Sequence, residues 1–446
     1  MTNKENEYVE TSKNKHLTIG INDDIPFGQA VILGLQHVLA MDVYVPPFII
    51  ATAVAMSSSD ASGLIQSTFL GAGIASLIQV LFFLKLPVCQ GPSFVPVGAI
   101  IGIYFGAKGM DTVLGASIVG AIAVVLLGFT GIYKYIVRHF IPTIVSGTII
   151  MIVGLTLLPT AFTSNIYPAT ETLSANQNML LAAITAAILI LFSMLGDYFP
   201  GLGKYFRISS VIIALVIGTT IASFMGGVDF QSVAEAPLFS LPKLAFVHYG
   251  LHFDISAILT MLVIYMVLLA ETTGTWYAVS SVTEEPITDE QINKGVIGEG
   301  LGCMVAALVG TTPVTGYSTN AGIISITGVA SKKVFVMASC WFILLSFIGK
   351  LSALIHAVPS SVIGGVFAVV CVIILLSGFR VIKNQAFSER ELYIIGVPLI
   401  IAIGLLFMPT EIKESAPQFL QYLLDSPIAL SAIAAIVMNK LIPVKN

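Results

Sequence analysis

The stretch ISAILTMLVIYMVLLAETTGTWYAV, residues 255–279, decides the fold class, because it is long and apolar enough to cross a lipid bilayer. It carries one acidic residue, Glu271. A carboxylate near the middle of a bilayer costs about 2.5 to 3.5 kcal/mol on insertion scales, so it should face protein or a water-filled cavity. Glu271 is therefore a candidate binding residue. The alternative is a structural glutamate that is protonated or hydrogen-bonded to a neighbouring helix.

The composition of the whole chain agrees with that segment. Of 446 residues, 56% are hydrophobic and 10% are charged, whereas a soluble domain carries about a quarter charged residues. The sequence therefore predicts an all-α polytopic protein of the cell membrane. Residues 1–24 are polar and lack a cleavable apolar core, so they are expected to form a cytoplasmic tail. The four cysteines have no paired spacing, so we expect no disulfide, metal or cofactor.

Apolar runs long enough to cross a bilayer predict fourteen transmembrane segments. They centre near residues 35, 73, 100, 120, 151, 186, 216, 265, 304, 325, 343, 370, 400 and 434. With the N-terminus inside, an even number of crossings places the C-terminus inside as well. Cytoplasmic loops should then be enriched in Lys and Arg. Of the 20 such residues, the only ones expected outside are Lys108, Lys243, Lys350 and Lys413.

Short echoes between the two halves predict an internal repeat. VPSSVIGGVFAVV at 358–370 resembles IPTIVSGTIIMIV at 141–153, and the Leu-Ala step before Met41 resembles the one before Glu271. Both offsets are close to half of the chain. Seven crossings per half would insert the second half upside down, which gives the 7+7 inverted repeat found in many secondary transporters.

Two of the predicted segments are broken, one near 91–105 and one near 311–328. Pro92 and Pro96 forbid a continuous helix in the first, and residues 311–320 of the second are rich in Pro, Gly, Ser and Thr. Each should carry a short extended stretch followed by a half-helix. Irregular backbone at membrane depth is tolerated only where it is buried in protein or lines a cavity. The N-termini of half-helices offer N–H donors and partial positive charge, so we expect the binding site between them.

The side chains expected at this site suit a flat heterocycle. Glu271 can accept hydrogen bonds from ring N–H groups, Phe94 offers a face for stacking, and Thr275 lies one helical turn beyond Glu271, where it can bond to ligand or carboxylate. Together they favour a nucleobase. The alternatives are core packing for Phe94 and helix capping for Thr319 and Asn320.

These residues resemble the nucleobase-ascorbate transporters, also called xanthine/uracil permeases. The family signature is Gln, Glu or Pro, then Asn-x-Gly, four variable residues, Thr, and Arg, Lys or Gly. Residues 320–328 match it from the asparagine onward, and Thr319 departs from it. The resemblance covers about residues 26–442. The other matching residues are Gln36, His37, Phe94 and Glu271.

The resemblance implies a core domain that carries substrate against a gate domain, an elevator-type movement, a homodimer and proton symport. The core would comprise residues 25–135 and 250–356, and the gate residues 136–228 and 357–442. The substrate-binding residues would be Glu271, Phe94, Thr319, Asn320, Ser93 and Thr275. The orienting and coupling residues would be His37, Gln36 and Glu271, and the residues that shape the second half-helix would be Gly322 and Thr327.

Two departures affect the expected substrate and coupling. Thr319 stands where carriers of xanthine or urate usually have Gln, those of uracil Glu and those of ascorbate Pro. Thr275 stands where relatives often have a titratable Asp or His, which leaves proton or sodium coupling open. Gly328 resembles the purine-type members. The sequence therefore predicts an importer of an oxidised purine, xanthine or urate, by cation symport.

Three alternatives belong beside this prediction. The first is a carrier of uracil or another pyrimidine. The second is an exchanger or channel for inorganic anions on the same architecture, which Glu271 disfavours because a carboxylate repels an anion. The third, an intramembrane enzyme, lacks a GxSxG motif, metal-ligand spacing and a second acid within a placed span. No nucleic-acid partner is expected.

Overall fold

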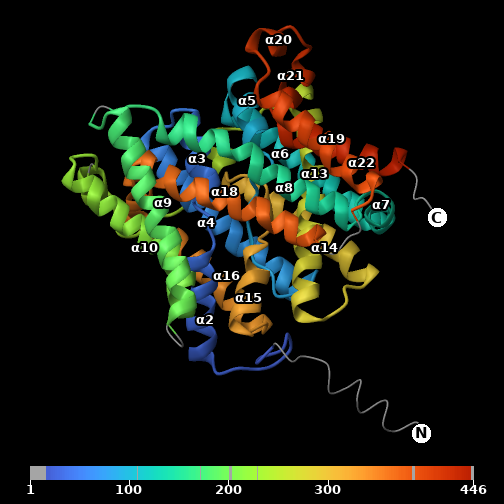
Figure 1. The fold of residues 1–446 in the computed structure, drawn as a ribbon, viewed down its shortest axis with the longest axis horizontal. Coiled ribbons are helices and arrows are strands. Elements are labelled where there is room, and N and C mark those ends of the chain that lie inside the picture. The colour runs from blue at the N-terminus through green and yellow to red at the C-terminus, as the bar shows by residue number, and fades with distance from the viewer. Residues whose placement is uncertain are drawn as a thin grey trace.

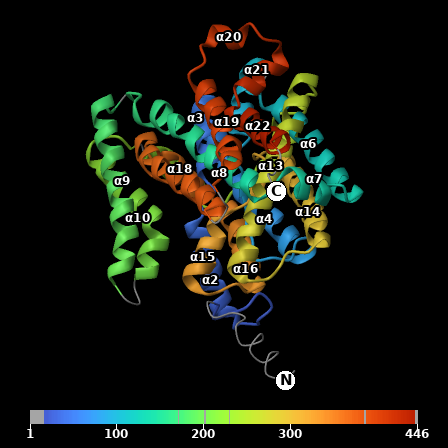
Figure 2. The same cartoon turned by 45° about the vertical axis from the view of Figure 1, so that its right-hand side comes forward.

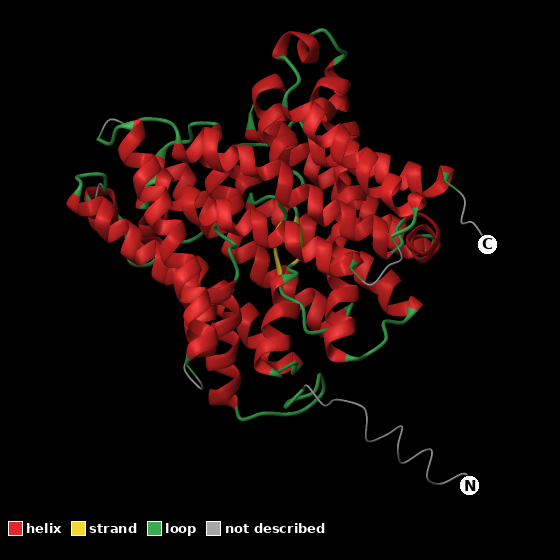
Figure 3. Ribbon diagram, in the orientation of Figure 1, coloured by secondary structure: helices red, strands yellow, loops and turns green. Residues whose placement is uncertain are grey.

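The computed structural model describes residues 17–107, 109–170, 172–199, 203–228, 230–383 and 387–442. Residues 1–16 of the expected tail and Lys108 lie outside the described residues. Helices form most of the described chain, and two strands of three residues each lie near the centre of the molecule (Figure 3). The remaining segments are short connections, so the backbone hydrogen bonds are satisfied mainly within helices, as a lipid environment requires.

In chain order, the helices and strands form a first half up to α11 and a second half from α12 onward (Figure 1). The first half contains α2 (Phe27–Ala40), α3 (Val45–Ala53), α4 (Ser58–Leu77), the π-helix η1 (Ile78–Phe82), β1 (Gln90–Pro92), α5 (Val97–Ala107), α6 (Met110–Thr130), α7 (Tyr133–Phe140), α8 (Thr143–Thr160), the π-helix η2 (Ala161–Ile166), α9 (Ala175–Tyr198), α10 (Gly203–Phe224) and α11 (Gln231–Glu235). The second half contains α12 (Ala245–His248), α13 (Ile255–Thr283), α14 (Asp289–Val309), β2 (Val314–Gly316), α15 (Thr319–Thr327), α16 (Lys332–Ser346), α17 (Gly349–Ala357), α18 (Ser360–Ile382), α19 (Glu389–Leu406), α20 (Thr410–Glu414), α21 (Gln418–Leu424) and α22 (Pro427–Leu441).

The helices make this a multi-pass membrane protein. Among the described residues, eight helices are long and apolar enough to cross a bilayer, or up to ten if each of two sharply bent pairs counts as one span. The bends are 82° between α16 and α17 and 87° between α21 and α22. Each of the fourteen expected centres falls within a helix. The number of crossings and the 7+7 repeat stay predictions, since several of these helices are too short to cross alone.

Polar side chains set where several long helices begin. Thr288 and Ser174 form capping boxes with Gln291 and Gln177 at the starts of α14 and α9, and Asp254 accepts from the backbone N–H of Ala257 at the start of α13. These contacts satisfy N–H groups that a helix start leaves unpaired. The turn between α13 and α14, which carries Glu284 and Glu285, therefore leads into a capped helix start.

The two segments that echo each other in sequence form α8 and α18, which pack side by side (Figures 1 and 2). Their glycines allow a close antiparallel approach. A Cβ at Gly154 would lie 2.4 Å from the carbonyl oxygen of Cys371, and one at Gly378 would lie 2.6 Å from that of Gly147. The helices α9 and α10 lie beyond α18 at one edge, whereas α7 and α14 lie at the other (Figures 1 and 2). The antiparallel pair is the arrangement that an inverted repeat requires.

The segment that precedes α2 packs against the end of α15. The backbone N–H groups of Thr18 and Ile19 both donate to the carbonyl oxygen of Gly328, at 2.8 and 3.0 Å. Lys333 donates to Asp24 at 2.6 Å, and this contact holds the pKa of the Asp24 carboxyl below its usual value. The second half-helix is thus tied at its C-terminal end to the start of the first crossing.

Candidate functional site

The two broken segments meet at a short antiparallel strand pair. β1 pairs with β2 in the register Gln90 with Gly316 and Pro92 with Val314. Each strand is followed within a few residues by a half-helix, α5 after β1 and α15 after β2. Pro92 ends β1 and limits the length of the strand pair, because proline has no N–H to donate to a ladder and fits only at strand ends and edges. The expected extended stretches and half-helices are therefore present, and they lie against each other.

Glu271 lies beside this strand pair. Its Oε2 accepts a hydrogen bond from the Ser93 hydroxyl at 2.7 Å, and the carboxylate is half-buried. Ser93 follows β1 directly, and its backbone N–H donates to the carbonyl oxygen of Pro313 at 2.9 Å, just before β2. The Ser93 Oγ also accepts from the N–H of Val95. The structure thus brings Glu271 and Ser93 together between the two broken segments.

Two threonines of α13 hold β2 in place. Thr272 Oγ1 accepts from the N–H of Gly316 at 3.0 Å, and Thr275 Oγ1 donates to the carbonyl oxygen of the same residue at 3.0 Å. Both threonines are buried. The proton of the Thr275 hydroxyl is therefore used by the backbone, and not by the Glu271 carboxylate. Thr275 could therefore make its predicted contact with a ligand only as an acceptor, through the lone pairs of its hydroxyl oxygen.

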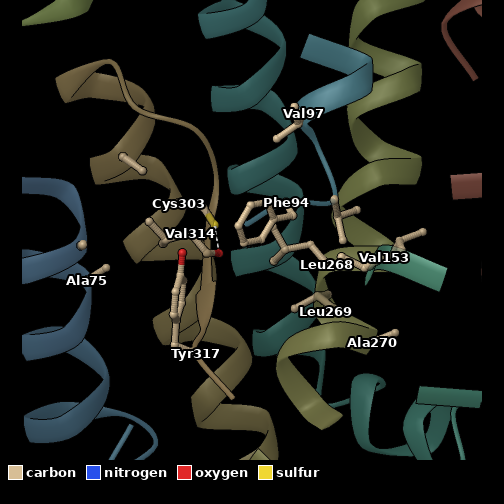
Figure 4. Packing of buried hydrophobic residues seen from close by; sticks show 14 of the residues in the cluster. Ala75, Phe94, Val97, Val153, Leu268, Leu269, Ala270, Cys303, Val314 and Tyr317 are labelled. Atoms are coloured by element: carbon tan, nitrogen blue, oxygen red, sulfur yellow. Dashed lines mark hydrogen bonds between the residues drawn. The ribbon is translucent and has the colours of Figure 1, made fainter. Parts of the chain in front are cut away.

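Phe94 lies at the contact between the expected core and gate domains. Its ring is 5% exposed and stacks on Phe367 of α18, with ring centroids 5.8 Å apart and planes inclined by 16°. Figure 4 shows Phe94 between the β2 side of the site, with Val314 and Tyr317, and the α13 side, with Leu268. Phe94 is thus packed, as the alternative interpretation expected, and its stacking partner Phe367 lies in the expected gate domain.

Asn320 links the second half-helix to the first crossing. Its side-chain Nδ2 donates to the carbonyl oxygens of Tyr317 at 2.9 Å and Cys89 at 3.4 Å, and its Oδ1 lies 3.3 Å from His37 Nδ1. The His37 ring packs on Phe335 with centroids 4.4 Å apart. The N-cap of α15 is Ser318, and it makes no side-chain capping bond. Asn320 is therefore a buried bridge and not a helix cap.

The remaining predicted site residues are Thr319, Gln36, Gly322 and Thr327. Thr319 Oγ1 and Gln36 Nε2 are buried without a hydrogen-bond partner in the described part of the chain. Gly322 is exposed, and a Cβ there would meet nothing within 4 Å, so packing does not require glycine at this position. Thr327 ends α15, where its Oγ1 donates to the carbonyl oxygen of Ile323 at 2.8 Å. Gly328 follows with φ 69°, a conformation that favours glycine.

The expectation that no second acid lies within a span is wrong. Glu299 lies at the midpoint of α14, is 1% exposed, and interacts electrostatically with Glu271. Its Oε2 accepts from Gln79 Nε2 at 2.9 Å. Asp42, between α2 and α3, is also buried at 6% exposure. Both acids were missed because their depth depends on tertiary packing that hydropathy does not reveal.

The sequence of the chain is similar to those of known permeases. The model of the permease family that comprises xanthine and uracil permeases matches residues 28–411. A putative purine permease of Clostridium perfringens is 31% identical over 95% of this chain and 92% of its own length. The uric acid permease PucJ of Bacillus subtilis is 32% identical over 84% and 83%, and the xanthine permease XanP of Escherichia coli K12 is 30% identical over 98% and 96%.

The fold is shared with a more distant group. The transmembrane domain of the cyanobacterial bicarbonate transporter BicA superposes with a TM-score of 0.59 at 16% identity, over 95% of this chain and 100% of that one. At that level of identity, the match concerns the architecture alone.

Proposed function

The chain belongs to the xanthine/uracil permease family, whose members are transporters and not enzymes, and we propose that it imports an oxidised purine, xanthine or urate, by proton symport. The family membership supports a nucleobase, and the names of two relatives support an oxidised purine. The observation that carries the proposal is the Glu271 carboxylate, held by Ser93 between the two broken segments.

The chemistry of the site supports this substrate class. Oxidised purines present ring N–H donors and carbonyl acceptors in one plane. Ser93 engages Oε2 of Glu271, which leaves Oε1 to accept from a ring N–H. The starts of α5 and α15 supply N–H groups for ligand carbonyls. Phe94 supplies an aromatic face once Phe367 moves away.

The movement that we propose is a displacement of the core domain against the gate domain. Phe94 and Phe367 lie on opposite sides of that contact. A cavity of about 180 Å³ lies on the same boundary, lined by Val97 and Ile101 of α5 and by residues of α8, α19 and α22. Val97, in the lining of this cavity, begins α5 three residues after Phe94. The homodimer, the cytoplasmic termini and the domain limits given above are part of the same proposal and rest on the family resemblance.

Proton coupling follows from the same carboxylates. A proton taken up near Glu271 and a bound base would each favour the other, because a second buried negative charge opposes the ionised Glu271 that accepts from the ring N–H. Glu299 of α14 lies near enough to Glu271 of α13 for the two carboxylates to repel each other, so Glu299 is the candidate carrier of that proton. An inorganic anion fits this site less well, since both acids would repel it.

Uptake into proteoliposomes tests the proposal. With an acidic exterior, radiolabelled xanthine should accumulate, and a protonophore should abolish the accumulation. Unlabelled urate should compete more strongly than unlabelled uracil. Flux of bicarbonate or chloride with no xanthine uptake would contradict the proposal and favour the anion exchanger. Stronger competition by uracil would favour the pyrimidine carrier.

A further inference from the structure

Asp42 is a buried acid to which the proposed function assigns no role. It lies in the break between α2 and α3, in the sequence LAMDVYVPP, where Pro46 and Pro47 belong to the first turn of α3. The side chain is 6% exposed, and its Oδ2 is buried without a hydrogen-bond partner among the described residues. Buried polar atoms are nearly always paired, so an unpaired carboxylate oxygen calls for a ligand or a functional reason.

The surroundings of Asp42 place it at the candidate site. Tyr317, which follows β2 and donates its hydroxyl to the carbonyl oxygen of Pro92 at 3.1 Å, lies near both Asp42 and Glu271. Asp42 also lies near Cys371 of α18. Cys371 lies one helical turn after Phe367, the residue that stacks on Phe94, so both face the core from the same side of α18. Asp42 therefore belongs to the same contact between domains as Phe94.

Two further buried polar atoms without a partner among the described residues lie at the start of α3 and at the start of α15. The Tyr44 hydroxyl is buried without a partner in the described chain, and Tyr44 interacts electrostatically with Asp42. Thr319 Oγ1, at the start of α15, is likewise unpaired, and the adjoining Asn320 bridges to His37 of α2. Several unsatisfied polar atoms from two facing segments are typical of a site that is completed by a polar ligand.

The sequence echo gives Asp42 a place in the proposed repeat. Leu39, Ala40 and Met41 correspond to Leu269, Ala270 and Glu271. Asp42 thus stands one residue beyond the position that matches Glu271. In an inverted repeat, equivalent positions approach a central site from opposite sides of the membrane.

We propose, on the basis of the function proposed above, that Asp42 is a second carboxylate of the substrate site, which accepts a hydrogen bond from a ring N–H of a fused bicyclic purine. Glu271 holds an N–H at the other end of the ligand. Thr319 has a shorter side chain than the Gln that xanthine and urate carriers usually have, so it leaves room at the end of the ligand opposite Glu271. Asp42 supplies the hydrogen-bond acceptor at that end. Asp42 would then determine specificity for bases with N–H donors on both rings.

Uptake competition with singly N-methylated xanthines tests the role of Asp42. In the wild-type protein, methylation at either of two ring nitrogens should weaken competition about tenfold or more, because each methyl group removes a hydrogen bond to a carboxylate. Asp42→Asn should lower the apparent affinity for xanthine by a similar factor. In this variant, methylation at one of the two ring nitrogens should no longer weaken competition, while methylation at the other still should. Asp42→Glu should restore part of the discrimination.

Asp111→Asn, at the start of α6, is the matched control and should leave the whole analogue profile unchanged. An Asp42→Asn profile equal to that of the wild type, or weakened equally for every analogue, would overturn the role of Asp42. If the variant does not fold, the wild-type profile decides, because a penalty at a single position contradicts two carboxylates. Absence of nucleobase uptake by the wild type would refute the proposed function itself.

Discussion

At the scale of single residues, the sequence pointed to Glu271 and, through the family resemblance, to Ser93, but not to the bond between them or to Glu299. Glu271 stands out because an acid in an apolar run must have a reason to be there, and proline and glycine mark the segment that carries Ser93. The partners of these residues were not predictable, since the bond between Ser93 and Glu271 joins residues 178 positions apart. Glu299 was missed because α14 begins with charged residues, so its depth in the membrane is ambiguous in the sequence.

Thr272 shows how much the strand geometry depends on one hydroxyl. Thr272→Val leaves the buried N–H of Gly316 without its acceptor, which should cost about 1–3 kcal/mol. We expect a lower apparent melting temperature in detergent and reduced uptake. Thr260→Val is the matched control, because its hydroxyl donates to the carbonyl oxygen of Ser256 within the same helix and has no other partner in the described part of the chain. Equal melting temperatures and uptake for the two variants would show that the bond to Gly316 does not hold the strand.

At the scale of elements, hydropathy predicted where helices lie better than where they end. Each expected centre falls in a helix, because the apolar runs are long. The π-helix that continues α4 and the 82° bend after α16 have no signal in composition. The extended stretches were expected from proline, but the register of β1 with β2 could not be, because it is fixed by tertiary contacts on both sides.

The close approach of α14 to α6 depends on glycine. A Cβ at Gly300 would lie 2.7 Å from the backbone nitrogen of Val125 and 3.0 Å from the carbonyl oxygen of Ala121. Gly300→Ala should therefore force the two helices apart at a cost of about 1–3 kcal/mol and lower the apparent melting temperature. Gly404→Ala, in α19, meets nothing within 4 Å and should be neutral or slightly stabilising. A Gly300→Ala protein as stable as the wild type would contradict this packing.

At the scale of the whole molecule, the repeat and the two domains were expected from short echoes and from family resemblance. The antiparallel contact between α8 and α18 agrees with the repeat. Among the described residues, counting crossings by helix length gives fewer than the sequence predicted. The two broken crossings divide their residues between strands and short helices, and α19 carries three charged residues in its first turn.

A cross-link between core and gate tests the proposed movement of the core domain. A Cβ at Gly102 of α5 would lie 3.5 Å from the Cβ of Asp425, between α21 and α22, which is within disulfide range. Oxidation of the Gly102→Cys, Asp425→Cys double variant should stop uptake, and reduction should restore it. The two single-cysteine variants control for loss of the ion pair between Lys413 and Asp425. Undiminished uptake by fully cross-linked protein would exclude sliding at this contact.

Equilibrium binding of radiolabelled xanthine to purified protein tests the site at Glu271 most directly. The wild type should bind xanthine saturably, with urate as a competitor. Glu271→Gln keeps the size of the side chain but replaces the carboxylate, so binding should weaken about tenfold or more, while Glu235→Gln, in the short helix α11 outside the site, should bind as the wild type does. Xanthine affinity that is unchanged in Glu271→Gln would contradict a carboxylate-centred site between the two broken segments.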